Sequence, residues 1–246
     1  MRRGIAWTAV AAVTLFTIYL LPARAETTFT PKAGESFTFR IYFAGIALGE
    51  QKITATSAKT SDGRPALFFE QLLDSFPSIL VDYHEKRTVL WDLDGIFPLA
   101  EEATIVQGHK TMHEKFVFDP AQGLATIDRT SFDGTVAAYN LPCTAGTQTG
   151  TSLMYYLRTF PWERGQDRLP LLGGKGTEWY TFTVAVENHP IVVPFGRFEQ
   201  TYHLYNREIK YDVWVDRGPY HLPLEFKSRL GIGVAQAKLV AARNYK

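Results

Sequence analysis

The sequence predicts a mainly β protein in which one main helix packs against an antiparallel sheet. Short segments of alternating apolar and polar residues follow one another closely, and turns rich in Gly, Asp, Asn and Pro separate them. Only one stretch of the chain has the periodicity of an amphipathic helix. Such close spacing of short strands favours hairpins and meanders over parallel units joined by crossover helices. The chain has 246 residues, 46% of them hydrophobic, which is enough apolar material for a packed core.

The N-terminal segment has the pattern of a secretory signal rather than of a folded element. Two arginines near the start precede an apolar run at residues 5–21, and a small-x-small sequence ends at Ala25. The alternative is an uncleaved membrane anchor, but the run is shorter than the roughly 20 residues that a span needs. We therefore expect a signal peptide at residues 1–25 and one mainly β domain at residues 26–246. The expected location is the periplasm, with no transmembrane segment in the mature chain.

The first strand is expected at residues 36–43, where three phenylalanines and an isoleucine alternate with more polar residues. Gly45 and Gly49 follow it and permit a tight reversal or a bulge. The same alternation predicts further strands in the first half, at residues 50–58, 66–73, 86–93, 99–107, 113–119, 124–132 and 135–141. In the second half it predicts strands at residues 177–189, 198–206, 208–216, 222–230 and 233–242.

A helix is expected at residues 149–160, in the stretch TGTSLMYYLRTF. Its large apolar side chains recur at the spacing i, i+3, i+4 and i+7, which places them on one face: Leu153, Tyr156, Leu157 and Phe160. Thr149 or Thr151 can cap its start, and Pro161 disfavours its continuation. A strongly curved sheet has a concave face that one helix can cover. The helix is therefore either core that fills this curve, which the pattern favours, or a lid over an apolar cavity.

Arg158 lies away from the apolar face of this helix. We expect it at the rim of the concave face, where its charge would meet an anionic headgroup or a carboxylate of a partner. The alternative is a buried arginine paired with a carboxylate. The candidate ligand-binding or lid residues are Leu153, Tyr156, Leu157, Arg158 and Phe160.

Several segments together resemble the bacterial family of exported proteins known as domain of unknown function 3108. The matching segments, in chain order, are GESFTFRIYFAGIALGEQKI at 34–53, SLMYYLRTFPWERGQ at 152–166, VPFGRFEQ at 193–200, VWVDRGPYHLPLEFK at 213–227 and LGIGVAQAKLV at 230–240. One departure from the family is VDRGPY, where the family tends to place another acidic residue after Asp216, and it affects only a turn. The resemblance implies a strongly curved antiparallel sheet or half-barrel with one main helix packed on its concave face, similar to the periplasmic lipoprotein carriers. It implies no established reaction.

Motifs for catalysis or metal binding are weak. The chain has no Gly-x-Ser-x-Gly sequence of an α/β-hydrolase. The sequence GGKGT at 173–177 has Leu169 where a phosphate-binding loop needs its first glycine, so we expect a hairpin turn there. His109, His113 and Glu114 would suit zinc on a helix, but their flanks predict strands. We therefore expect no metal and no cofactor.

The acidic pairs and the single cysteine are assigned structural roles. Asp92 and Asp94 lie in an expected turn, so we expect solvated charges. Glu101 and Glu102 point to opposite faces of a strand, and we expect solvated charges there too, rather than a glycosidase pair. Cys143 lacks a neighbouring base and a disulfide partner, which favours a structural thiol. No catalytic residue is assigned.

Charge and composition exclude one class of function and leave three. With 26 basic and 25 acidic residues and no long charge run, the chain has no electrostatic basis for nucleic-acid binding. The favoured hypothesis is a non-enzymatic carrier of an apolar or amphipathic, lipid-like ligand. The second is an envelope protein that binds a protein partner without a ligand. The third is an enzyme acting on envelope polysaccharide or lipid, which needs converging carboxylates or a His–carboxylate group in a cleft.

Overall fold

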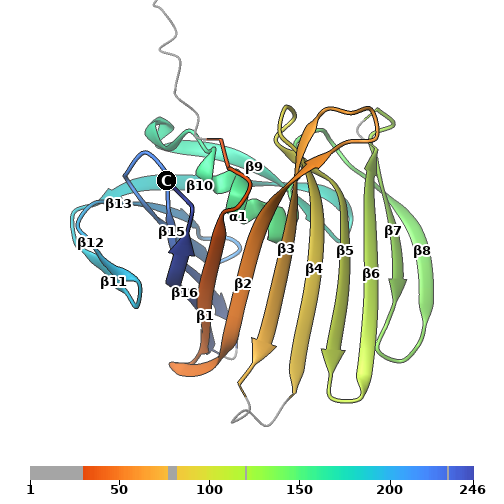
Figure 1. Ribbon diagram of the computed structural model, residues 1–246, viewed down its shortest axis with the longest axis horizontal. Helices are drawn as coiled ribbons and strands as arrows, with labels where there is room; N and C mark the ends of the chain where they lie inside the picture. Colours follow the sequence, from red (N-terminus) through yellow and green to blue (C-terminus); the bar gives the residue numbers. More distant parts are fainter. Residues whose placement is uncertain (1–29, 77–81, 120, 232) are drawn as a thin grey trace, which may run out of the picture.

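The computed structural model describes residues 30–76, 82–119, 121–231 and 233–246 (Figure 1). The predicted signal peptide at residues 1–25 lies outside these residues. In the described part the chain forms sixteen strands, one α-helix and one short 3-10 helix. Across these residues, no helix combines the length and the apolar character needed to cross a bilayer.

The strands before the helix form a meander, with these bounds: β1 (Ser36–Phe43), β2 (Ile46–Lys59), β3 (Pro65–Ser75), β4 (Tyr83–Asp92), β5 (Phe97–Gln107), β6 (Lys110–Asp119), β7 (Leu124–Thr130) and β8 (Val136–Pro142). The helix α1 (Gly150–Arg158) and the 3-10 helix η1 (Trp162–Arg164) follow. The second half contains β9 (Gln166–Gly173), β10 (Gly176–Glu187), β11 (Ile191–Val193), β12 (Gly196–Phe198), β13 (Thr201–Asn206), β14 (Tyr211–Asp216), β15 (Pro223–Leu230) and β16 (Gly233–Arg243).

Fourteen of the strands form one antiparallel sheet, in the order β8-β7-β6-β5-β4-β3-β2-β1-β16-β15-β14-β13-β10-β9, and β11 and β12 form a separate hairpin. The first and last strands are neighbours inside this sheet, because Ser36 pairs with Arg243 and Phe43 with Ala235. Figure 1 shows the sheet curving so that β9 and β10 pass behind the wall made by β1 to β8, with α1 between them. The curved antiparallel sheet and its single α-helix confirm the predicted fold class.

The helix lies at the centre of the core because it packs between the two arms of the sheet. On one side Met154 and Tyr155 join a hydrophobic cluster that includes residues of β1 to β4, and the Tyr155 ring stacks on Phe69 with centroids 3.8 Å apart. On the other side Leu153 and Leu157 join a cluster from β9, β10, β13 and β14. The helix is therefore buried on two faces, whereas its sequence predicts one.

The bounds of β1 agree with the prediction, but three strands, β9, β11 and β12, have no predicted counterpart. β9 contains Pro170, which cannot donate a backbone hydrogen bond and makes the segment look like a turn. It is tolerated because β9 ends the sheet, where the Pro170 carbonyl accepts a hydrogen bond from the Gln148 N–H at 2.8 Å. The sequence at 173–177 forms the predicted turn, which joins β9 to β10.

Candidate functional site

The start of α1 is fixed by a capping box. The Thr149 hydroxyl accepts a hydrogen bond from the Ser152 N–H at 3.2 Å, and the Ser152 hydroxyl accepts one from the Thr149 N–H at 2.9 Å. Thr149, one of the two predicted caps, is therefore confirmed. Its hydroxyl also donates to the Glu101 carboxylate of β5, and the Thr151 hydroxyl lies 3.4 Å from the same carboxylate. The cap thus ties the helix to the concave face of the sheet.

Strand register brings charged residues together on this concave face. Arg87 of β4 pairs with Ala103 of β5. Ala103 pairs with Glu114 of β6, which pairs with Arg129 of β7. Glu101 is two residues from Ala103 and shares its face, as Glu85 does with Arg87. We call the resulting cluster the charge network, and its members are Glu85, Arg87, Glu101, Glu114 and Arg129.

The two guanidinium groups of the charge network bind its three carboxylates. Arg87 Nη1 lies 2.9 Å from Glu101 Oε1, and Arg87 Nε contacts Glu85. Glu114 lies between the two arginines, with Oε2 3.9 Å from Arg87 Nη2 and Oε1 2.5 Å from Arg129 Nη2. The carboxylate side chains are at most 10% exposed. Each buried negative charge therefore has a positive partner.

The charge network keeps Arg87 charged and leaves one N–H donor of Arg129 without an acceptor. Burial lowers the pKa of the Arg87 guanidinium, but the charges and hydrogen bonds of Glu85 and Glu101 outweigh this effect, so the pKa lies above its ordinary value. Arg129 Nε is buried and has no hydrogen-bond partner among the described residues. A buried donor without an acceptor is unfavourable, so this atom lowers the stability of the charge network.

A pocket of about 280 Å³ lies beside the charge network at the start of α1. Its polar wall consists of Arg87, Glu101, Arg129 and Thr149. Its apolar wall consists of Phe116, Ile127, Tyr139, Leu141 and Leu172. Three glycines complete the lining, Gly150, Gly173 and Gly174. The charged wall, from the buried Glu101 to Arg129 with a side chain 39% exposed, therefore stands next to apolar side chains that are partly open, with Tyr139 39% exposed.

Arg158 does not lie at the rim of the concave face, so that expectation is wrong. Its side chain is fully buried and forms an ion pair with Glu35, which is also fully buried. Its Nε and Nη2 each donate to the main-chain carbonyl of Tyr220 at 3.2 Å, and its guanidinium lies 5.0 Å from the Phe37 ring centroid. The alternative of a buried arginine paired with a carboxylate describes the structure.

The position of Arg158 follows from the burial of α1 between the two arms of the sheet. The face away from the predicted apolar stripe is core as well, so a charge there needs a buried partner. Burial raises the pKa of Glu35 and lowers that of Arg158, because a low-dielectric surrounding disfavours either charge, while the ion pair opposes both shifts. His221 Nδ1 donates to the main-chain carbonyl of Arg158 at 3.0 Å and braces the end of the helix.

The other four candidate residues contribute to the core. Three of them are at most 5% exposed: Leu153, Leu157 and Phe160. Tyr156 is half-buried. None of the five candidates lines the pocket, which is lined instead by Thr149 and Gly150 at the start of the helix. A role of the five in binding or covering a ligand stays a prediction.

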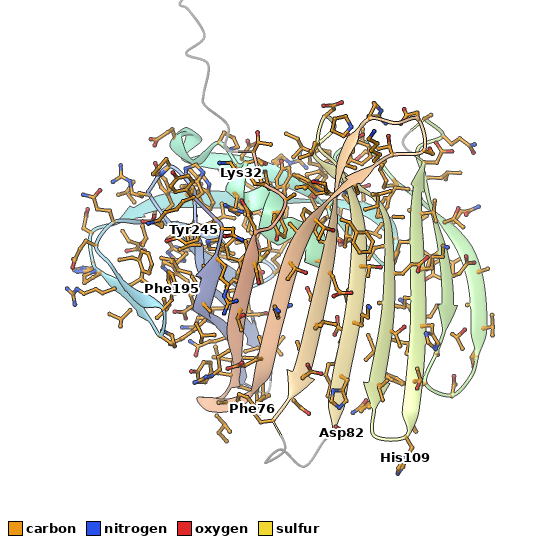
Figure 2. All side chains as sticks on the ribbon, viewed as in Figure 1. Lys32, Phe76, Asp82, His109, Phe195 and Tyr245 are labelled. Atoms are coloured by element: carbon orange, nitrogen blue, oxygen red, sulfur yellow. The ribbon has the colours of Figure 1, made fainter. Side chains whose placement is uncertain are left out.

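The histidines of the HKTMHE segment do not converge on Glu114. His109 lies in the turn between β5 and β6, at the far end of the strands (Figure 2), and is exposed. His113 and Glu114 point to opposite faces of β6, and His113 Nδ1 lies 3.1 Å from Thr104 Oγ1. Within the described ranges, no group of three or more His, Cys, Asp or Glu residues is arranged to hold a metal ion.

Two acidic residues that were expected in solvent are buried. Asp92 is 1% exposed, and Arg64 Nη1 lies 2.5 Å from its carboxylate. Glu101 is 2% exposed, whereas Glu102 on the opposite face of β5 is exposed, so their predicted divergence is confirmed but the solvation of Glu101 is not. Asp92 is buried at the end of β4, where its carboxylate also accepts hydrogen bonds from the Asp94 and Gly95 N–H groups of the following turn, and Arg64 comes from the turn before β3. Glu101 is buried because Arg87 on the neighbouring strand binds its charge. Cys143 is buried and free.

Comparisons with known proteins place the chain in a family and support its fold. The family described as "Protein of unknown function (DUF3108)" matches residues 38–240. A solved β-barrel-like protein of domain of unknown function DUF1849 from Brucella abortus has a TM-score of 0.51 and 10% identity, over 87% of this chain and 98% of that chain. No protein with a curated description matches the chain.

Two more distant structures have TM-scores too low to show a shared fold. One is described as exported with a YmcC-like fold, from Bacteroides fragilis, with a TM-score of 0.29 and 8% identity over 88% of this chain and 99% of that chain. The other is described as a lipoprotein, from Parabacteroides distasonis, with a TM-score of 0.27 and 9% identity over 88% of this chain and 98% of that chain.

Proposed function

The chain belongs to the DUF3108 family, and we propose that it is an exported protein that binds a small amphipathic ligand in the pocket at the start of α1. One observation carries this proposal, which is that buried charges form one wall of the pocket and partly open apolar side chains form the other. A ligand with a polar and an apolar end would complement both walls. The secretory pattern of residues 1–25 supports export.

The volume of the pocket limits the size of the bound group. The pocket measures about 280 Å³. A small molecule would fit, as would the polar end of a longer one. This size is near the lower end of ligand pockets, which enclose about 300–1,000 Å³.

The contacts of the charge network support binding more than catalysis. Glu101 accepts hydrogen bonds from Arg87 and from the hydroxyls of Thr149 and Thr151. A general acid or base must instead exchange its proton with a substrate in the pocket. We therefore propose a binding role without a reaction.

Mass spectrometry of an organic extract of the purified protein tests this proposal. We expect an amphipathic molecule to co-purify with the wild type. In Gly150→Leu a side chain would enter the pocket, and the fold should persist because a Cβ at Gly150 meets no atom within 4 Å. Gly231→Leu is the matched control, since its Cβ also meets open space but lies outside the pocket. Equal amounts of the molecule in all three proteins would contradict the proposed site.

The free edge of the sheet favours a second candidate function, protein–protein interaction. β8 ends the sheet and contains no charged residue, and Val136 is 75% exposed. An edge strand without charges pairs readily with a strand of another chain. This function would be favoured over ligand binding if the organic extract contained no co-purifying molecule and if Val136→Lys abolished the association of the protein with another chain.

A further inference from the structure

The polar wall of the pocket carries a surplus of negative charge. The charge network contains three carboxylates and two guanidinium groups, so its formal charge is one negative. These charges are close to one another and largely removed from water, where electrostatic interactions are stronger than in bulk solvent. A charged ligand group would therefore respond to the whole network and not to a single arginine.

Arg87 is engaged mainly by the carboxylates of the charge network. Its Nε contacts Glu85, its Nη1 donates to Glu101 at 2.9 Å, and its Nη2 faces Glu114 at 3.9 Å. A ligand that bound this guanidinium would compete with these buried carboxylates for its charge. Removing one partner from a buried ion pair is strongly unfavourable, so Arg87 serves to hold the carboxylates in place.

Arg129 is the arginine that remains available. Glu114 neutralises its charge through Nη2 at 2.5 Å, while its buried Nε has no hydrogen-bond partner among the described residues. Arg129 thus lines the pocket with a side chain that is 39% exposed and whose positive charge is already balanced by Glu114.

We infer that the polar end of the ligand is an uncharged hydrogen-bond acceptor, such as an amide, ester or hydroxyl group, to which the Arg129 guanidinium donates; this rests on the proposed function. A carboxylate or a phosphate would bring further negative charge close to Glu101 and Glu114, and like charges at a shared buried site disfavour one another. An ammonium group would be attracted by the net charge, but the carboxylate oxygens already accept from arginine and threonine.

A matched series of six-carbon ligands tests this inference on the purified mature protein. Hexanamide and hexanoate have the same shape and differ in charge, and hexylammonium carries the opposite charge. Titration at neutral pH, followed by NMR chemical shifts, gives the three dissociation constants. We expect hexanamide to bind at least about tenfold more tightly than hexanoate, which corresponds to about 1.4 kcal/mol.

Arg129→Lys tests the assigned donor, because lysine retains the charge but lacks the planar guanidinium and its fixed N–H donors. The variant should lose most of the preference for hexanamide over hexanoate while its Tm stays near that of the wild type. Arg197→Lys is the matched control, since Arg197 is exposed on β12 and lies outside the pocket. A preference for hexanamide that survives in Arg129→Lys would overturn the role of this residue.

The outcomes separate this inference from the proposed function. Equal or tighter binding of hexanoate would overturn the uncharged head but leave an amphipathic ligand in the pocket. Tightest binding of hexylammonium would overturn it too, and would show that the net negative charge selects the ligand. Absence of binding by all three probes would overturn the proposed pocket and the inference with it.

Discussion

Replacing Glu35 with glutamine tests how much the buried ion pair at the end of α1 stabilises the fold. Both side chains of the pair are fully buried, and in the variant Arg158 would keep its hydrogen bonds to the Tyr220 carbonyl but lose this carboxylate. Removing one partner of a buried ion pair costs about 3–5 kcal/mol. In a chain of this size each kcal/mol lowers Tm by about 2–4 °C, so we expect a fall of roughly 6–20 °C.

The same substitution on a neighbouring strand provides the control. Glu50 Oε1 lies 2.8 Å from Arg40 Nη2, but the two side chains are 39% and 40% exposed, so water screens the pair. Urea unfolding, followed by circular dichroism and tryptophan fluorescence, gives the free energy of unfolding of each variant. If Glu35→Gln lost no more stability than Glu50→Gln, burial would not be the source of the effect and the reasoning would be refuted.

A double variant separates the charges from the packing. Glu35→Gln combined with Arg158→Met removes both the carboxylate and the guanidinium, and apolar replacements of buried ion pairs are often neutral or stabilising. The double variant should therefore be more stable than Glu35→Gln alone in the same urea titration. A double variant that lost the sum of the two single losses would show that the charges do not interact.

Four further predictions follow from residues described above. Leu157→Ala, at a side chain 1% exposed, should lower the free energy of unfolding by about 2–5 kcal/mol in urea, and a smaller loss would show that the cavity collapses. Burial lowers the pKa of His221 in the folded protein. As the pH falls below about 6.5, the unfolded chain therefore takes up a proton at His221 before the folded chain does, and the free energy of unfolding decreases. His221→Asn, which retains a donor and tolerates the φ of 43°, should make Tm less dependent on pH between about 7 and 5 than in the wild type. EDTA should leave Tm unchanged, and a fall abolished by His113→Ala would reveal a metal. N-terminal sequencing of the exported protein should begin at Glu26, and a retained Met1 would contradict cleavage.

Local patterns in the sequence predicted most of the fold. The alternation of residues 36–43 reproduces the bounds of β1, because a period of two is the geometry of a strand itself. β9 was missed because its proline and the preceding glycine resemble a turn, and only its place at the end of the sheet makes the proline acceptable. That place depends on pairing with distant segments, which the local sequence does not contain.

The charge network was missed although the sequence contains a signal for it. In four strands a charged residue lies two positions from an apolar residue, so the alternation of the strand places both on the inward face. These residues are Arg87, Glu101, Glu114 and Arg129. One such residue is easily assigned to solvent, but four in consecutive strands, two positive and two negative, indicate a buried network.

The partner of Arg158 could not be predicted from the residues around it. Glu35 is 123 positions away, before β1, and nothing near either residue marks the pair. The helical pattern also predicts one apolar face, whereas the curved sheet surrounds α1 on two sides. A hydrophobic pattern reports which residues avoid water, but it does not report which charges the fold encloses together.

The pairing of β1 with β16 gives the sheet a seam that closes last during synthesis. The hairpins from β1 to β8 join segments that are adjacent along the chain and can form while the rest is still being made. The seam needs residues 233–243, so until they emerge β1 has an unpaired edge, and Phe37 and Phe39, at most 1% exposed in the finished fold, lack their cover. A chain that ended before β16 would thus keep its meander but expose an apolar edge at β1. Such an edge is a template for aggregation, whereas pairing with β16 places β1 in the interior of the sheet.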